Sequence, residues 1–189
     1  MLKYYARTFL PWIVLAVGSG FDIRIGAVGG LMTALVLLAD DRRRGTGWDA
    51  MILDISSAIY MALLSALCFL ATHAPLLQYG TSLAIGWLAL TAWLGLAFGR
   101  PFTAAIARRN VSEFAATTAL FRRINIVLTT AWALCFTLDA ATLAALQHWA
   151  PHTTIALILC KFGFFIAAAL FTARYPESAQ RRAGLAPIN

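Results

Sequence analysis

Charged residues are scarce in this 189-residue chain, where Asp, Glu, Lys and Arg together make up 12%. Soluble domains carry about 25% charged residues and about 45–50% apolar ones, whereas 61% of this chain is hydrophobic. So few charges cannot cover a water-facing surface of this size. The composition therefore excludes a soluble globular domain, and no polar segment is long enough to form one separately.

Cysteine is also rare, and the chain has no CxxC pair that would indicate a redox or zinc motif. The three cysteines lie inside apolar runs, where buried thiols behave as small hydrophobic groups. They are Cys68, Cys135 and Cys160. The histidines stand near helix ends instead of at matching depths inside a bilayer, which argues against haem. These are His73, His148 and His152. No HExxH, GxSxG, phosphate-loop or Rossmann motif is present, so we expect no metal, no cofactor and no catalytic residue of these classes.

Six apolar stretches, separated by Gly, Pro or polar residues, fill the chain. With about 20 residues for each membrane span, they predict an all-α, polytopic integral membrane protein that forms a single transmembrane domain over residues 1–189. The predicted helices cover residues of about 5–21, 24–40, 50–73, 76–98, 122–148 and 151–174.

The first of these helices is the least certain, because the apolar stretch 9–21 makes a helix only about 20 Å long. The hydrocarbon core is about 30 Å thick, so Tyr4 and Tyr5 would have to extend the span as interfacial aromatics. A cleaved signal peptide is the alternative, with Lys3 and Arg7 before an apolar core.

The basic residues indicate the orientation of the helices. The net charge is +7, and 13 of the 15 basic residues fall on one side of an alternating six-helix path. Positive residues mark the cytoplasmic side, so both termini are predicted to be cytoplasmic. The same bias explains the positive charge without a nucleic-acid partner. The 13 residues are Lys3, Arg7, Arg42, Arg43, Arg44, Arg100, Arg108, Arg109, Arg122, Arg123, Arg174, Arg181 and Arg182.

The segment at residues 100–121 is too short and too polar to span. Pro101 suits the first turn of a short helix, and Phe102 and Ile106 give that helix an apolar side. Ser112 can cap a second short helix. We expect short cytoplasmic interfacial helices whose arginines meet anionic headgroups; the alternative is a docking site for a cytoplasmic partner.

Two GxxxG pairs, Gly26 with Gly30 and Gly95 with Gly99, have the spacing that allows close approach of helices in lipid. We expect internal packing from both pairs, with a homo-oligomer as the alternative.

Ionisable residues inside a span are costly and indicate function by default. Lys161 and Asp139 fall at nearly equal depth in the last two predicted helices, about 18 and 22 Å from the cytoplasmic ends. If both face inward they form a buried pair, which either fixes helix register or serves as a substrate or proton site. The other open reading is that one of them faces a water-filled vestibule without the other.

Further polar candidates lie near helix ends. Asp54 is expected to form an interfacial ion pair, Asn125 to make an interhelical hydrogen bond, and Asp22 to lie in a turn. The run at residues 40–44, Asp-Asp-Arg-Arg-Arg, neutralises itself inside a polar turn. It lacks the spaced carboxylates that hold magnesium in prenyl-diphosphate enzymes.

Short motifs along the chain resemble the intracellular septation protein A family of bacterial inner-membrane proteins. They are Phe9-Leu10-Pro11, Phe21-Asp22-Ile23, Arg100-Pro101, Asn125 and Lys161-Phe162-Gly163. The resemblance implies a non-enzymatic protein linked to envelope upkeep and to the division machinery. The chain departs from the family at Asp139, where the family tends to an uncharged Asn.

Three functions follow from these observations. The first is a non-enzymatic role in cell-envelope synthesis or septation in the bacterial plasma membrane, through contacts with lipids or with envelope and division proteins. The second is a small-solute transporter or channel that uses Asp139 and Lys161. The third is an enzyme acting on a lipid or isoprenoid, with Asp22, Asp54 or Asp139 as the acid.

Overall fold

The computed structural model describes residues 7–71, 75–108, 111–150, 153–182 and 184. All regular structure in this part of the chain is helical, which confirms the predicted all-α class, and no strand occurs among these residues. The chain divides into two compact units, residues 1–80 and 81–189. Each unit is described by itself below.

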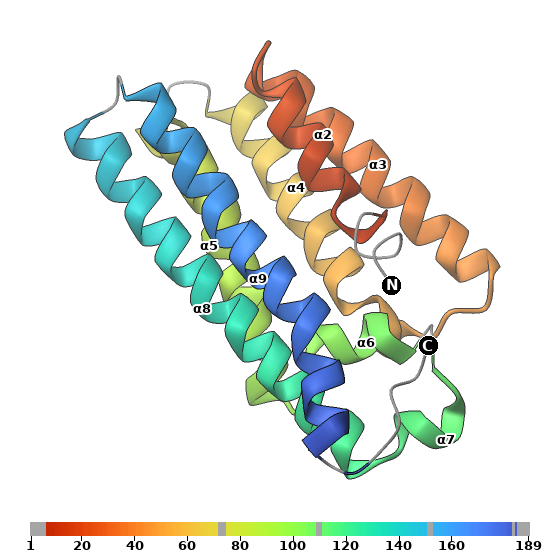
Figure 1. Cartoon of the computed structure of the whole chain (residues 1–189). Helices are drawn as coiled ribbons and strands as arrows, with labels where there is room; N and C mark the ends of the chain where they lie inside the picture. Colours follow the sequence, from red (N-terminus) through yellow and green to blue (C-terminus); the bar gives the residue numbers. More distant parts are fainter. Residues whose placement is uncertain (1–6, 72–74, 109–110, 151–152, 183, 185–189) are drawn as a thin grey trace. The chain divides into compact units, whose positions relative to one another are not determined.

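The first unit contains a helical hairpin and a third helix packed against it. Helix α3 packs against both α2 and α4, and the three helices lie side by side in Figure 1. Asp22 caps α3 by accepting a hydrogen bond from the backbone N–H of Arg24, at 2.7 Å. The elements are α2 (Leu10–Gly18), α3 (Ile23–Arg43), the 3-10 turn η1 (Trp48–Met51), α4 (Ile52–Leu70) and the 3-10 turn η2 (Pro75–Tyr79).

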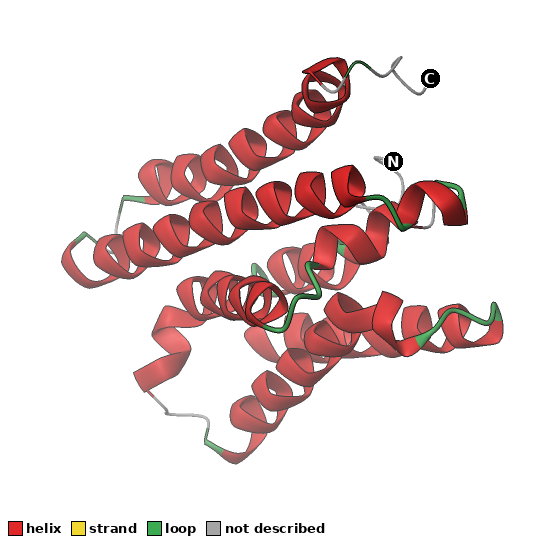
Figure 2. Cartoon of the chain, turned by 90° about the horizontal axis from the view of Figure 1, so that it is seen from below, coloured by secondary structure: helices red, strands yellow, loops and turns green. Residues whose placement is uncertain are grey.

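The second unit contains three long helices and two short ones. Helix α8 packs against α9 and against the short helix α6; Figures 1 and 2 both show α8 and α9 side by side. Trp132 Nε1 donates to Thr172 Oγ1 at 2.9 Å, which sets the register of α8 and α9. The elements are α5 (Gly80–Ala97), α6 (Phe102–Arg108), α7 (Glu113–Ala116), α8 (Ala119–Trp149) and α9 (Thr154–Arg182).

Five helices in the described part of the chain are long and apolar enough to cross a membrane, namely α3, α4, α5, α8 and α9. These helices differ in how much of their most apolar segment is buried in the protein. The buried share of that segment is largest in α4, at 44%, and smallest in α9, at 6%. Helix α9 therefore has few fully buried residues in this segment, although one side of it packs against α8.

Helix α2 is shorter than the predicted span at about 5–21. Arg7 and Thr8 belong to a separate helical turn, and α2 begins only at Leu10. The break falls where Pro11 enters the first turn of α2, because proline has no N–H to donate to a preceding turn. The nine residues of α2 rise about 14 Å.

Helix α6 differs from the predicted interfacial helix, because it lies buried. Pro101 and every residue from Phe102 to Ile106 are buried, Thr103 completely. Thr103, Ala104 and Ala105 are small, and small side chains let a helix approach its neighbour closely. Only the second short helix, α7, has no buried residue, and Ser112 caps it as predicted.

The two GxxxG pairs have different environments. A Cβ on Gly26 would lie 2.7 Å from the backbone oxygen of Leu15 in α2, so α2 and α3 meet there. A Cβ on Gly30 would lie 2.9 Å from the sulfur of Met61 in α4. Gly26 and Gly30 therefore lie where α3 touches its two neighbours.

Gly95 lies buried in the last turns of α5 and Gly99 follows the end of that helix, which differs from the predicted packing between helices. Gly99 has φ +66°, and no atom lies within 4 Å of a Cβ built on it. The backbone N–H of Arg100 donates to Gly95 O at 2.7 Å and that of Gly99 donates to Leu96 O at 3.0 Å. This is a Schellman turn, in which glycine supplies the left-handed residue.

Candidate functional site

One group of interacting polar side chains in the first unit begins with two adjacent carboxylates at the end of α3. The sequence predicted a polar turn at residues 40–47, but α3 continues through Arg43. A Schellman turn ends the helix: Gly45 has φ +77°, and the Thr46 N–H donates to Asp41 O at 3.0 Å. Asp40 and Asp41 therefore lie on a helix, about 100° apart around its axis.

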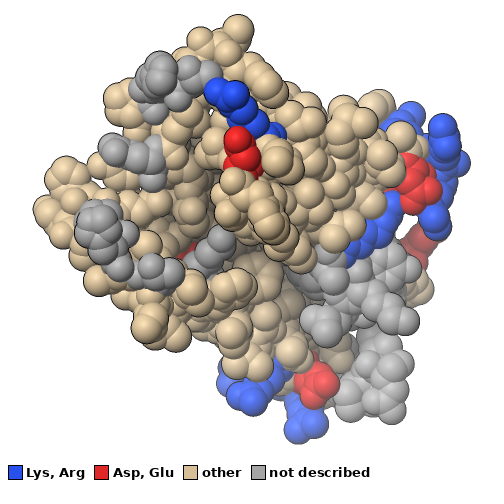
Figure 3. All heavy atoms as spheres, turned by 90° about the horizontal axis from the view of Figure 1, so that it is seen from above, with Lys and Arg blue, Asp and Glu red and all other residues tan. Residues whose placement is uncertain are grey.

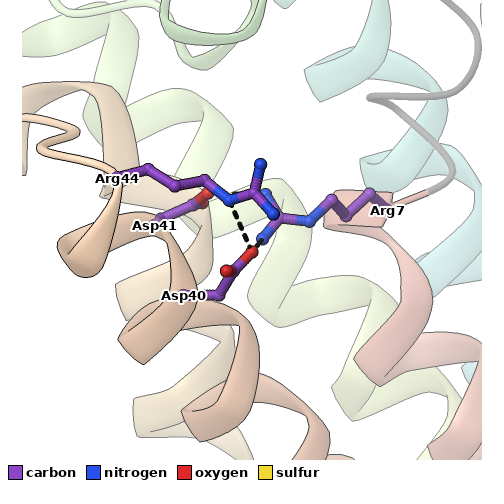
Figure 4. Close-up of polar contacts among 4 residues, drawn as sticks. All are labelled: Arg7, Asp40, Asp41 and Arg44. Carbon is purple, nitrogen blue, oxygen red and sulfur yellow. Dashed lines mark hydrogen bonds and ion pairs between the residues drawn. The ribbon is translucent and has the colours of Figure 1, made fainter.

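Both carboxylates bind the guanidinium of Arg7, more than 30 residues earlier in the chain. Arg7 Nη1 donates to Asp41 Oδ1 at 2.5 Å, and Nη2 donates to Asp40 Oδ2 at 2.6 Å. Arg44 Nε also donates to Asp40 Oδ2, at 2.9 Å. Figure 4 shows the two arginines meeting above the end of α3. We call these four residues the Arg7 cluster.

The members of the Arg7 cluster differ in their exposure to solvent. The side chain of Asp41 is 4% exposed and that of Arg7 is 27% exposed, whereas Arg44 is 70% exposed. The Arg7–Asp41 pair is therefore the buried part of the cluster. Desolvation alone would lower the pKa of Arg7, but the hydrogen bond and charge of Asp41, with smaller contributions from Asp40 and Asp54, outweigh it and raise the pKa.

Asp54 adds a third carboxylate to this environment. It lies in the first turn of α4 and is buried, and its charge acts on the guanidinium of Arg7. An acidic residue in a first turn also interacts favourably with the helix dipole.

A second set of contacts holds the same N-terminal segment against α4. Trp12 Nε1 donates to Ser57 Oγ at 2.8 Å, and the rings of Trp12 and Tyr60 stack with centroids 5.1 Å apart. Phe9 is buried as well. Five residues of this segment are thus part of the core of the first unit, namely Thr8, Phe9, Pro11, Trp12 and Leu15.

The polar core of the second unit lies between α6 and α8. The hydroxyl of Thr103 donates to the backbone oxygen of Asn125 at 2.9 Å and lies 2.8 Å from the hydroxyl of Thr129. The side chain of Asn125 donates to Phe121 O in its own helix, at 2.9 Å. The bond between helices therefore uses the carbonyl of Asn125, where the sequence predicted its side chain.

Asp139 and Lys161 lie on helices that pack together, α8 and α9. Asp139 is 2% exposed. The side chain of Lys161 lies outside the described part of the structure, so the predicted pair stays a prediction. Among the described residues, no group of three or more His, Cys, Asp or Glu side chains could hold a metal ion.

Comparisons of the chain with protein-family models, with curated proteins and with solved structures found no match.

Sequence reasoning missed Arg7 as the central residue of its cluster, and missed Thr103 and Thr129. Arg7 was counted only as a charge that sets topology. Its partners are 33 and 34 residues away, and no local spacing indicates such a pair.

Proposed function

We propose that the protein is a non-enzymatic component of the bacterial plasma membrane, with six spans and both termini in the cytoplasm. In this proposal it supports envelope synthesis or septation by contacting lipids and other membrane proteins, as its resemblance to the intracellular septation protein A family implies. The proposal rests on one observation in the first unit. Arg7 forms internal ion pairs with Asp40 and Asp41, whereas the long helices of this unit expose apolar side chains.

Exposed aromatic residues at helix ends support the membrane embedding. Trp48 precedes α4 and Phe69 lies at its far end, and both are more than half exposed. In the second unit, Phe98 follows α5 and Trp149 ends α8, with exposures of 76% and 80%. Aromatic rings gather at the two interfaces of a bilayer. Figure 3 shows charged residues in a few small groups on a surface that is otherwise mostly uncharged.

The described helix ends support the proposed orientation. Arg42 and Arg43 end α3, Arg122 and Arg123 begin α8, and Arg181 and Arg182 end α9. If α3, α4, α5, α8 and α9 cross in alternating directions, all these ends fall on one side. The positive-inside rule makes that side cytoplasmic.

Single-cysteine labelling in intact cells tests this topology. In a chain whose three native cysteines are replaced by alanine, Gly47→Cys and Gln180→Cys are expected to resist a membrane-impermeant maleimide. Thr153→Cys, which lies between α8 and α9, is expected to react. All three should react after the membrane is permeabilised, and labelling of residue 47 or 180 in intact cells would contradict the topology.

A transporter is the second candidate, because Asp139 is almost fully buried in a helix long enough to span and intramembrane carboxylates often mark ion or proton pathways. The two functions differ in what neutralising the charges does. A scaffold needs Asp139 and Lys161 only for packing, whereas a transporter needs their charge.

Deletion of the gene followed by complementation distinguishes the two. We expect the deletion to alter cell length or septum placement, and the native protein to restore both. The double variant Asp139→Asn with Lys161→Met is expected to restore them equally well, at an equal level of folded protein. A double variant that folds but fails to complement would favour the transporter, and a deletion with normal envelope and division would contradict the proposed role.

A further inference from the structure

The turn that carries α7 holds an aromatic side chain away from the protein. Phe114 is 82% exposed, and no residue of α7 is buried. The turn nevertheless has a well-defined backbone. Ser112 Oγ accepts from the Ala115 N–H at 3.3 Å, Thr117 Oγ1 donates to Phe114 O at 2.8 Å, and Thr118 Oγ1 donates to Ala115 O at 2.8 Å.

The start of α8 adds positive charge beside this turn. Helix α7 contacts α8, and Figure 1 shows α7 next to the beginning of α8. Arg122 and Arg123 lie in the first turns of α8, both are exposed, and neither has an ion-pair partner among the described residues. The first turn of α8 contains no acidic residue, so the partial positive charge of the helix end adds to that of the arginines.

An exposed aromatic ring beside uncompensated arginines is the pattern of a surface that lies in the headgroup layer of a membrane. The ring gains free energy by leaving water for the acyl-chain boundary, and the arginines gain by approaching phosphates. An acidic soluble partner would satisfy the arginines, but it would need a pocket for one isolated phenyl ring.

We propose that the turn at residues 112–118, with Arg122 and Arg123, is an anchor for anionic phospholipid headgroups, into which Phe114 inserts. The proposal rests on the proposed membrane embedding and deepens it by naming the lipid class that this end of the second unit binds. Helix α6, which lies buried, takes no part in the anchor.

A spin label at position 114 tests the anchor. The full chain, with its three native cysteines replaced by alanine and with Phe114→Cys labelled, is placed in nanodiscs of phosphatidylglycerol or of phosphatidylcholine. Collisions with oxygen report lipid, and collisions with a soluble nickel complex report water. We expect the label to be protected from nickel in phosphatidylglycerol and more exposed to it in phosphatidylcholine, while a label at Glu113→Cys meets nickel in both.

Charge variants show whether the arginines bind the lipid. Arg122→Gln with Arg123→Gln is expected to move the equilibrium of the label toward water by about 30-fold, the equivalent of about 2 kcal/mol. Arg42→Gln with Arg43→Gln removes the same charge from the first unit and should leave the label unchanged. The variant Arg122→Lys with Arg123→Lys should preserve most of the protection.

Three results would overturn the anchor. The first is free access of nickel to the label at 114 in phosphatidylglycerol, and the second is an equal loss of protection in the variant Arg42→Gln with Arg43→Gln. The third is a loss of protection on adding millimolar inorganic phosphate, which would show that the site binds a free anion. A label at Leu134→Cys, on an exposed apolar position of α8, separates the two proposals. If oxygen reaches the label at 134 while nickel reaches the label at 114, the anchor is refuted but the membrane embedding stands. If nickel reaches both labels, the membrane embedding is refuted as well.

Discussion

Arg7→Met is expected to destabilise the protein by about 3–5 kcal/mol, the cost of breaking a buried ion pair. The substitution leaves the carboxylate of Asp41, whose side chain is 4% exposed, without the guanidinium that compensates it. The double variant Arg7→Met with Asp41→Asn should recover most of the loss, because an uncharged amide costs far less to bury than a carboxylate that has lost its guanidinium. Unfolding in mixed detergent micelles, followed by circular dichroism, measures each free energy.

Arg44→Met provides the matched control within the same cluster. It removes a hydrogen bond to Asp40 of similar length, 2.9 Å, but between side chains that are 70% and 39% exposed. Exposed ion pairs contribute little to stability, so this variant should lose much less stability than Arg7→Met. If Arg44→Met costs as much as Arg7→Met, burial does not decide the strength of these pairs and our account of the Arg7 cluster is wrong.

Gly26→Ala is expected to destabilise the first unit by about 3 kcal/mol, the upper end of the range for overpacking. The added methyl group would lie 2.5 Å from Ser19 Oγ, 2.6 Å from Ser19 N and 2.7 Å from Leu15 O. Two of these atoms belong to the backbone and cannot rotate away, so α2 must move from α3. Unfolding in mixed micelles measures the loss, and Gly26→Val should lose more.

Gly163→Ala is the control for this substitution. Gly163 lies in α9, and no atom stands within 4 Å of a Cβ built there. Alanine is favoured over glycine in a helix by about 0.5–1 kcal/mol, so this variant should be neutral or slightly more stable. A Gly26→Ala protein as stable as the native one would show that α2 and α3 do not approach as closely as the structure has them.

Much of the helical architecture could be predicted from residue order alone. Spans over α3, α4, α5, α8 and α9 follow from long apolar runs, because a chain segment in lipid must satisfy its own backbone hydrogen bonds and does so as a helix. The cap at Ser112 could be predicted as well, since an N-cap bond links residues only three apart. Such features depend on neighbours along the chain, and these are visible in a sequence.

Features that depend on distant residues needed the tertiary structure. Burial of α6 depends on how closely Thr103 approaches Asn125 and Thr129, 22 and 26 residues later. Gly26 and Gly99 stand in the same GxxxG spacing, yet one meets another helix and the other ends its own. Close helix packing and helix termination both favour glycine, because it has no side chain. The spacing therefore cannot tell the two roles apart, and only the fold decides which one applies.

The Arg7 cluster shows the same division most clearly. The sequence by itself determined that Arg7, Asp40 and Asp41 flank apolar helices, and that charges there must be solvated or paired. Which charge pairs with which was decided by the packing of α2 on α3, because that contact brings residue 7 to the end of a helix more than 30 residues later in the chain. Ion pairs act through space, and their strength depends on burial, a property that no residue has until the helices have packed.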